Sequence, residues 1–211
     1  MSSGKIFFDL DGTLINSKMR LYRLFCDITS QNIFNFDEYW ELKQAKNGHR
    51  FLTIKYLGYT ETDFIEFERK WFSLIETEKY LNYDEPFDFT KNVLAKLKSQ
   101  KFELYILTSR QFKEITLKQL FNLGLFPFFE KILITCGSKS KFDLVKESGI
   151  LLSYNDILVG DTGVDIDTAK ALNIRSVAVL SGFRNREVLE EYSPDFIEND
   201  IRFITSYVNG K

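Results

Sequence analysis

The stretch IFFDLDGTLIN at residues 6–16 decides the fold. Its apolar start predicts a buried strand, and two aspartates, Asp9 and Asp11, stand at the carboxyl end of that strand. Burying a carboxylate is costly unless a cation or a proton compensates its charge. The stretch therefore predicts a strand that ends at two carboxylates whose charge a cation or a proton must compensate.

Further apolar runs follow along the chain, separated by segments that are long enough for helices and patterned like them. Such alternation is typical of βαβ units that build a parallel sheet, whose strands are apolar throughout because both faces are buried. We therefore expect an α/β fold with a Rossmann-like parallel sheet core flanked by helices. The later strands are expected at 102–108, 131–135, 156–160 and 175–180, and a last edge strand and terminal helix in SPDFIEND and IRFITSYV.

The regular alternation breaks between the first run and the second. Residues 17–85 show helical periodicity with aromatic-rich apolar faces and contain no convincing strand. A stretch this long is not a structureless connection in a compact protein. We expect an inserted all-helical subdomain at 17–85, with residues 1–16 and 86–211 forming the core domain.

Composition narrows the classes of partner. The 211 residues carry 28 basic and 30 acidic side chains, spread along the chain, so no broad basic surface for nucleic acid is expected. No apolar run approaches the roughly 18 residues of a membrane span, and no signal peptide is recognisable. We expect a cytoplasmic protein without a membrane partner; monomer and homodimer both remain open.

Polar residues gather just after the predicted strands, and the carboxyl ends of parallel strands share one edge of the sheet. Clustered carboxylates at this edge would repel one another without a hard cation, and Mg²⁺ takes such oxygen ligands together with phosphate oxygens. Hydroxyl and lysine donors suit a phosphoryl group, and aspartate is a known nucleophile toward phosphorus. The residues concerned are Asp9 and Asp11, Thr108 to Arg110, Lys139 to Lys141, and Asp161 and Asp165.

DLDGT at 9–13, the strand that ends at Thr108, the lysine that opens a helix and GDTGVD at 160–165 resemble motifs I to IV of the haloacid dehalogenase-like hydrolase superfamily. The helical insertion stands where subfamily I of that superfamily carries its C1 cap, as in phosphoglycolate phosphatase and β-phosphoglucomutase. The resemblance implies a Mg²⁺-dependent phosphomonoester hydrolase. Its substrate would be a small phosphorylated metabolite, and its intermediate an aspartyl-phosphate.

The resemblance also implies residue roles. Asp9 would be the nucleophile, and Asp11 the general acid that protonates the leaving group and then the base that activates water. Asp9, the backbone carbonyl of Asp11, Asp161 and Asp165 would bind Mg²⁺. The phosphoryl group would be held by Thr108, the Ser109 amide and a lysine.

Several assignments have two interpretations. Lys141 is favoured over Lys139 as the phosphate-binding lysine. Arg110 follows Ser109 where many relatives have lysine, and it either adds positive charge for the substrate or faces solvent. His49 and Arg50 lie between two predicted helices of the insertion, where they would contact substrate or simply form a surface turn.

Other functions fit the same fold. A phosphomutase resembling β-phosphoglucomutase would share the aspartyl-phosphate, although the insertion shows no clear match to its sugar-bisphosphate site. A non-catalytic binding or regulatory protein of the same fold is a further alternative, although the motif acids are all present. Dehalogenase chemistry is disfavoured because Asp11, Gly12 and Thr13 form the phosphotransferase version of motif I.

Overall fold

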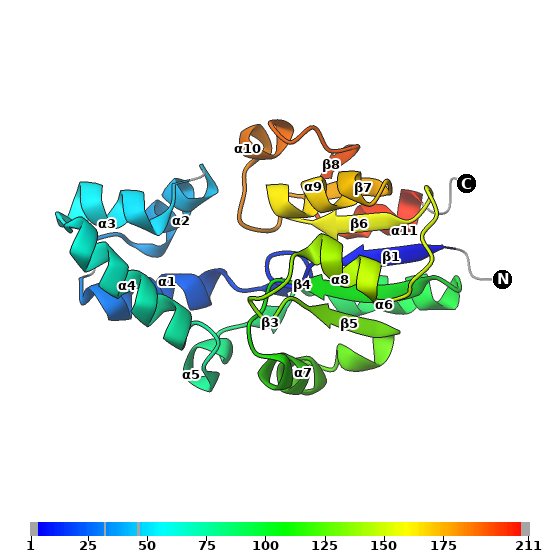
Figure 1. The fold of residues 1–211 in the computed structure, drawn as a ribbon, viewed down its shortest axis with the longest axis horizontal. Helices are drawn as coiled ribbons and strands as arrows, with labels where there is room; N and C mark the ends of the chain where they lie inside the picture. Colours follow the sequence, from blue (N-terminus) through cyan, green and yellow to red (C-terminus); the bar gives the residue numbers. More distant parts are fainter. Residues whose placement is uncertain (1–3, 32, 46, 208–211) are drawn as a thin grey trace.

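The computed structural model describes residues 4–31, 33–45 and 47–207. Its centre is a six-stranded parallel sheet with the strand order β5-β4-β1-β6-β7-β8 (Figure 1). The predicted α/β fold with a parallel sheet is confirmed. The strands are β1 (Lys5–Phe8), β4 (Glu103–Thr108), β5 (Lys131–Ile134), β6 (Ile157–Gly160), β7 (Arg175–Val179) and β8 (Phe196–Glu198).

Helices cover both faces of the sheet, and alternate residues of each strand point to opposite faces. Ile6 and Phe8 of β1 belong to a core cluster with α6 (Thr90–Ser99), α7 (Lys113–Asn122) and α11 (Arg202–Tyr207). Phe7 points the other way and packs with residues of the remaining layer. That layer holds α8 (Lys141–Glu147) and α9 (Gly163–Ala171), with α10 (Arg186–Glu190) packed beside α9. The 3₁₀ turn η1 (Phe126–Phe128) lies in the first layer, beside α7.

Strand β1 is the point where the strand order reverses. It pairs with β4 on one side and with β6 on the other, so the chain builds the sheet outward from β1 in two directions. At such a point the loops that leave the neighbouring strands diverge and open a crevice beyond their carboxyl ends. The predicted site residues that follow β1, β4 and β6 all lie at this crevice.

The helices between β1 and β4 form a separate body, which we call the helical insertion (residues 18–81). Figure 1 shows α1 to α5 grouped at one end of the molecule, away from the sheet and from both chain termini. These helices have their own aromatic core, which includes Phe25, Tyr39 and Phe67. They are α1 (Lys18–Thr29), α2 (Phe36–Gln44), α3 (His49–Leu57), α4 (Glu61–Leu74) and α5 (Glu78–Leu81).

A short antiparallel ribbon joins the helical insertion to the sheet. Its strands β2 (Ile15–Asn16) and β3 (Glu85–Pro86) are the outgoing and returning chain, and they pair Ile15 with Pro86. The Thr90 hydroxyl donates a hydrogen bond to the Leu14 carbonyl at 2.8 Å and fixes the returning chain against the core. The chain therefore leaves and re-enters the core at one place, directly beside the crevice.

Within the described part of the chain, no helix combines the length and the apolar character that crossing a membrane requires.

Candidate active site

Three buried carboxylates meet at the carboxyl end of the sheet. Asp9 follows β1, Asp161 follows β6 and Asp165 lies in the first turn of α9, and one oxygen of each lies within 4.8 Å of the others. Two glycines leave room for this approach: a Cβ at Gly160 would lie 2.2 Å from Asp165 Cγ, and one at Gly182 would lie 2.1 Å from Asp161 Oδ2. The backbone is thus shaped to bring the three acids together.

Lys141 joins two of the three acids in this cluster, Asp9 and Asp165. It is the first residue of α8, whose start is fixed by a capping box between Ser140 and Asp143. Its Nζ donates hydrogen bonds of 2.6 Å to Asp9 Oδ1 and of 2.6 Å to Asp165 Oδ1, and its side chain is only 3% exposed. Lys139, the alternative, forms an ion pair with Glu147 on the surface.

The cluster carries more negative charge than Lys141 neutralises. Burial raises the pKa of Asp9 to about 7, although the Lys141 ammonium opposes the rise. Burial, together with the charges of Asp9 and Asp165, also holds the pKa of Asp161 well above its usual range. An all-oxygen donor set with uncompensated charge fits a hard divalent cation such as Mg²⁺. The residues present therefore suit the metal that the sequence predicts.

Thr108 lies beside the cluster, at the end of β4, and is buried; the adjacent Ser109 is exposed. Both line a cavity of about 410 Å³ between the sheet and the helical insertion, together with Asp9 and Lys141. The insertion contributes Trp71 and other side chains to the opposite wall. The structure thus brings carboxylates, a hydroxyl and an ammonium to one cavity, a set that can bind a phosphoryl group and attack it.

The Asp11 carboxylate lines the same cavity but is held by arginines. Arg110 donates from Nε to Asp11 Oδ2 at 2.5 Å and from Nη2 to Oδ1 at 2.8 Å, which is a bidentate ion pair. Arg20 of α1 and the Ser17 hydroxyl also donate to Oδ1. Burial alone would raise the pKa of Asp11, but the Arg110 and Arg20 guanidinium groups hold it well below its usual range.

Asp84 forms ion pairs with both arginines. Its Oδ2 lies 3.3 Å from Arg20 Nη1 and accepts a hydrogen bond of 3.2 Å from Arg110 Nη2, and its side chain is fully buried. Burial raises the pKa of Asp84 to about 6, against the effect of the arginines. Because Arg20 belongs to the helical insertion, Asp84 to the returning chain and Arg110 to the core, these charges tie the three parts together.

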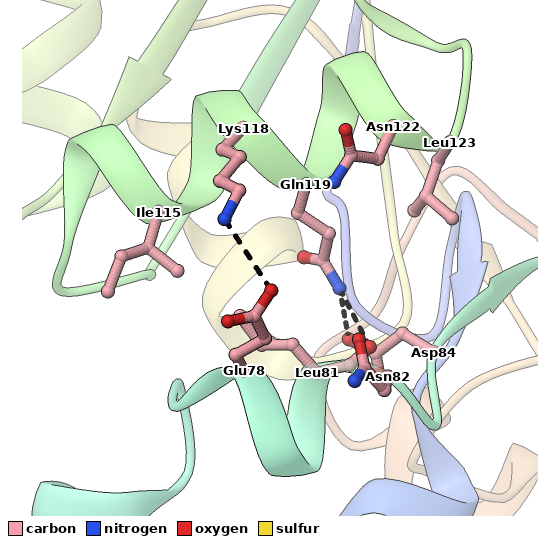
Figure 2. A pocket seen from close by; sticks show the side chains of 9 residues that line it. All are labelled: Glu78, Leu81, Asn82, Asp84, Ile115, Lys118, Gln119, Asn122 and Leu123. Carbon is pink, nitrogen blue, oxygen red and sulfur yellow. Dashed lines mark hydrogen bonds and ion pairs between the residues drawn. The ribbon is translucent and has the colours of Figure 1, made fainter.

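A second cavity, of about 370 Å³, lies behind Asp84 between α5 and α7. Figure 2 shows Gln119 of α7 reaching across it, where its Nε2 donates a hydrogen bond of 2.9 Å to Asp84 Oδ2. Lys118 and Glu78 face each other at 3.5 Å from α7 and α5. The hydrogen bond from Gln119 therefore fixes the Asp84 carboxylate from the α7 side.

His49 and Arg50 lie outside the cavity that holds the acidic cluster. His49 begins α3, where its Nε2 hydrogen-bonds the Tyr39 hydroxyl at 2.9 Å and its ring lies 4.0 Å from the Trp71 ring. Burial holds the pKa of His49 well below its usual range. Arg50 is exposed and forms an ion pair with Glu61. Both residues therefore begin a helix and do not form a surface turn, and their contact with substrate stays a prediction.

Sequence reasoning missed Arg20, Asp84 and Glu76, and left Arg110 undecided. Glu76 is buried and accepts hydrogen bonds from the backbone amides of Gln111 and Phe112, so it fixes the loop after β4. Arg20 lies in a helix and the other three in connecting segments, where a charged residue normally faces solvent. For these residues the sequence offered one signal. Arg110 directly follows Ser109, and this position suggested a positive charge for the substrate.

Comparison with known proteins agrees with this geometry. A family model described as haloacid dehalogenase-like hydrolase matches residues 6–179. A phosphoglycolate phosphatase of Aquifex aeolicus is 30% identical over 201 residues, which cover 90% of both chains. Pyrophosphatase PpaX of Halalkalibacterium halodurans is 24% identical over 211 residues, which cover 93% of both chains.

A solved structure shares the fold over its whole length. The haloacid dehalogenase-like family protein SP0104 from Streptococcus pneumoniae superposes with a TM-score of 0.78 at 24% identity, and the match covers 98% of this chain and 99% of that one. The family model spans the sheet from β1 to β7, the helical insertion and the acidic cluster. The chain therefore belongs to the haloacid dehalogenase-like hydrolase family.

Proposed function

We propose that the chain is a Mg²⁺-dependent phosphomonoester hydrolase that acts on a small phosphorylated metabolite through an aspartyl-phosphate intermediate. The observation that carries the proposal is the buried cluster of Asp9, Asp161 and Asp165 around Lys141, beside Thr108 in one cavity. The names of the two relatives, a phosphoglycolate phosphatase and a pyrophosphatase, support phosphoryl chemistry on small substrates.

In this reaction the Asp9 carboxylate attacks phosphorus, and the bond from phosphorus to the leaving oxygen breaks. Lys141 and Thr108 orient the phosphoryl oxygens. Asp11 gives its proton to the leaving oxygen, and then takes a proton from the water that attacks the aspartyl-phosphate. Water attack releases inorganic phosphate and restores Asp9.

The metal would be held by Asp9, Asp161 and Asp165, together with the backbone carbonyl of Asp11. When bound, Mg²⁺ supplies positive charge that offsets the carboxylates and the phosphoryl oxygens. Two contacts prepare Asp161 for this role, because the Phe183 amide donates to its Oδ2 at 2.7 Å and the Thr13 hydroxyl to its Oδ1 at 3.4 Å.

The helical insertion acts in this proposal as a cap over a core formed by residues 1–16 and 86–211. Its side chains form one wall of the cavity, and the two-stranded ribbon at Ile15 and Pro86 is its connection to the core. Closure of such a cap excludes water from the reacting phosphate, and opening releases the product.

The test is release of inorganic phosphate from a panel of phosphomonoesters, with Mg²⁺ and with EDTA. We expect metal-dependent release by the native protein, and a loss of at least about a hundredfold in Asp9→Asn, which removes the nucleophile while keeping its shape. Asp167→Asn is the matched control, because Asp167 is an exposed residue of α9. Equal activity of Asp9→Asn and Asp167→Asn, or full activity in EDTA, would contradict the proposal.

A further inference from the structure

Two buried arginines line the cavity without using all their hydrogen-bond donors. The side chains of Arg20 and Arg110 are 4% and 3% exposed. Among the described residues, Arg20 Nε and Nη1 and Arg110 Nη1 have no hydrogen-bond partner, although Arg20 Nη1 lies near Asp84 as an ion pair. Buried donors without partners are rare and costly. The two guanidinium groups therefore have capacity for a further acceptor.

The same arginines already bind a carboxylate in this structure. Arg110 binds the Asp11 carboxylate through two parallel N–H groups, and Arg20 adds a further donor to Oδ1. Such a fork matches the geometry of a carboxylate. The carboxylate now held belongs to Asp11, whose oxygens accept from Ser17 as well. With its lone pairs engaged in this way, Asp11 is not placed to transfer a proton to a substrate.

The local charges permit an exchange of one carboxylate for another. Besides Asp11, two buried acids, Asp84 and Glu76, lie close enough to the two arginines to balance their charge. The backbone amides that donate to Glu76 are neutral and leave its charge in place. A carboxylate that takes the place of Asp11 therefore keeps the total charge around the arginines unchanged.

We propose that Arg20 and Arg110 form a subsite for a carboxylate carried by the substrate, which takes the place of Asp11 on the two guanidinium groups. The inference rests on the proposed phosphatase function and names its substrate class, a phosphorylated hydroxy acid. The exchange breaks one ion pair and forms another, with no covalent change. It frees Asp11 to protonate the leaving oxygen. A substrate that carries the carboxylate should therefore have a higher kcat as well as a lower KM.

Matched ester pairs test the subsite in the native protein. Phosphoglycolate is compared with ethyl phosphate, and 3-phosphonooxypropanoate with propyl phosphate, so that each pair differs by a carboxylate in place of a methyl group. We expect kcat/KM to be about 10- to 100-fold higher for the carboxylate ester in at least one pair, the usual effect of charged hydrogen bonds. Equal kcat/KM within both pairs would overturn the proposal.

Substitution of the arginines tests which residues carry the preference. Arg20→Lys keeps the charge but removes the planar fork, and we expect the ratio of kcat/KM between the two esters to fall about tenfold. Arg186→Lys is the matched control, because Arg186 is exposed on α10, and it should leave the ratio unchanged. If Arg20→Lys lowers turnover of both esters equally, the arginines serve Asp11 alone and the proposal is wrong.

Binding measurements separate this proposal from the proposed function. Titration calorimetry with Asp9→Asn and Mg²⁺ compares phosphoglycolate with ethyl phosphate when attack on phosphorus is removed. Tighter binding of phosphoglycolate that is lost on adding Arg20→Lys supports the subsite, even if the native protein hydrolyses no ester and the proposed function fails. Hydrolysis of both esters together with equal binding would overturn the subsite and leave the phosphatase function intact.

Discussion

Replacing Lys141 with methionine would test the charge balance of the acidic cluster. Lys141 Nζ lies 2.6 Å from both Asp9 Oδ1 and Asp165 Oδ1, and methionine keeps much of its volume without the charge. Removing one partner of a buried ion pair costs about 3–5 kcal/mol. Because the Asp9 side chain is 11% exposed and keeps some water, we expect the lower value, about 3 kcal/mol, which corresponds to a fall in Tm of roughly 6–12 °C for a chain of this size.

Thermal denaturation at neutral pH, in EDTA and in Mg²⁺, measures this effect. Lys139→Met is the matched control, because Lys139 pairs with Glu147 on the surface, and its loss should change stability by less than about 0.5 kcal/mol. Mg²⁺ should raise the Tm of Lys141→Met more than that of the native protein, since the metal then takes over the charge that lysine neutralised. Equal destabilisation by the two substitutions, or an equal Mg²⁺ effect on native protein and Lys141→Met, would refute the reasoning.

Three further predictions concern glycines at positive φ, the buried Lys43 and the exposed Arg50. Gly12→Ala and Gly58→Ala both place alanine at positive φ, which at Gly58 should cost about 1 kcal/mol in denaturation experiments. At Gly12 the new Cβ would also lie 2.5 Å from Asp161 Oδ2 and 2.9 Å from Gly182 Cα, so Gly12→Ala should destabilise the protein more than Gly58→Ala does, and only Gly12→Ala should lower kcat/KM more than tenfold. Burial lowers the pKa of Lys43 to about 8, so the unfolded chain binds more protons between about pH 8 and 10.5 and native stability rises with pH there. Lys43→Met should therefore be about 1–3 kcal/mol more stable than native protein at pH 7, and chemical denaturation should show this gain disappearing by about pH 10.5. Arg50→Gln should change kcat/KM less than twofold, because Arg50 pairs with Glu61 away from the cavity; a larger loss would show that the insertion brings Arg50 to the substrate.

The sheet was predictable because its signal is local. Runs such as FELYILT at 102–108 are apolar on both faces, and only strands buried between two helix layers require that. The β2 and β3 ribbon was not predicted, because two residues per strand are too few to show alternation. It forms because the two ends of the helical insertion must pass the same edge of the core.

The candidate site was likewise predictable only in part. DLDGT at 9–13 and GDTGVD at 160–165 are short motifs whose acids follow strands, so their meeting could be inferred from a parallel sheet. The ion pairs of Arg20 and Arg110 with Asp84 and Asp11 could not, because the Arg110–Asp11 pair alone spans 99 positions of the chain. In sequence, Arg20 is one polar position of an amphipathic helix, and only the folded arrangement buries it.

The central place of β1 also determines the order in which the chain can fold during synthesis. β1 leaves the ribosome first, yet Ile6 pairs with Leu104 on one side and Ile157 on the other. The helical insertion is made in between and has its own core around Phe25 and Phe67, so it can fold while β1 still lacks both neighbours. Non-local strand pairing of this kind is slow, and an unpaired apolar strand promotes aggregation. In a nascent chain stalled before β6, the β6 side of β1 would stay unpaired, and an open sheet edge of this kind promotes aggregation.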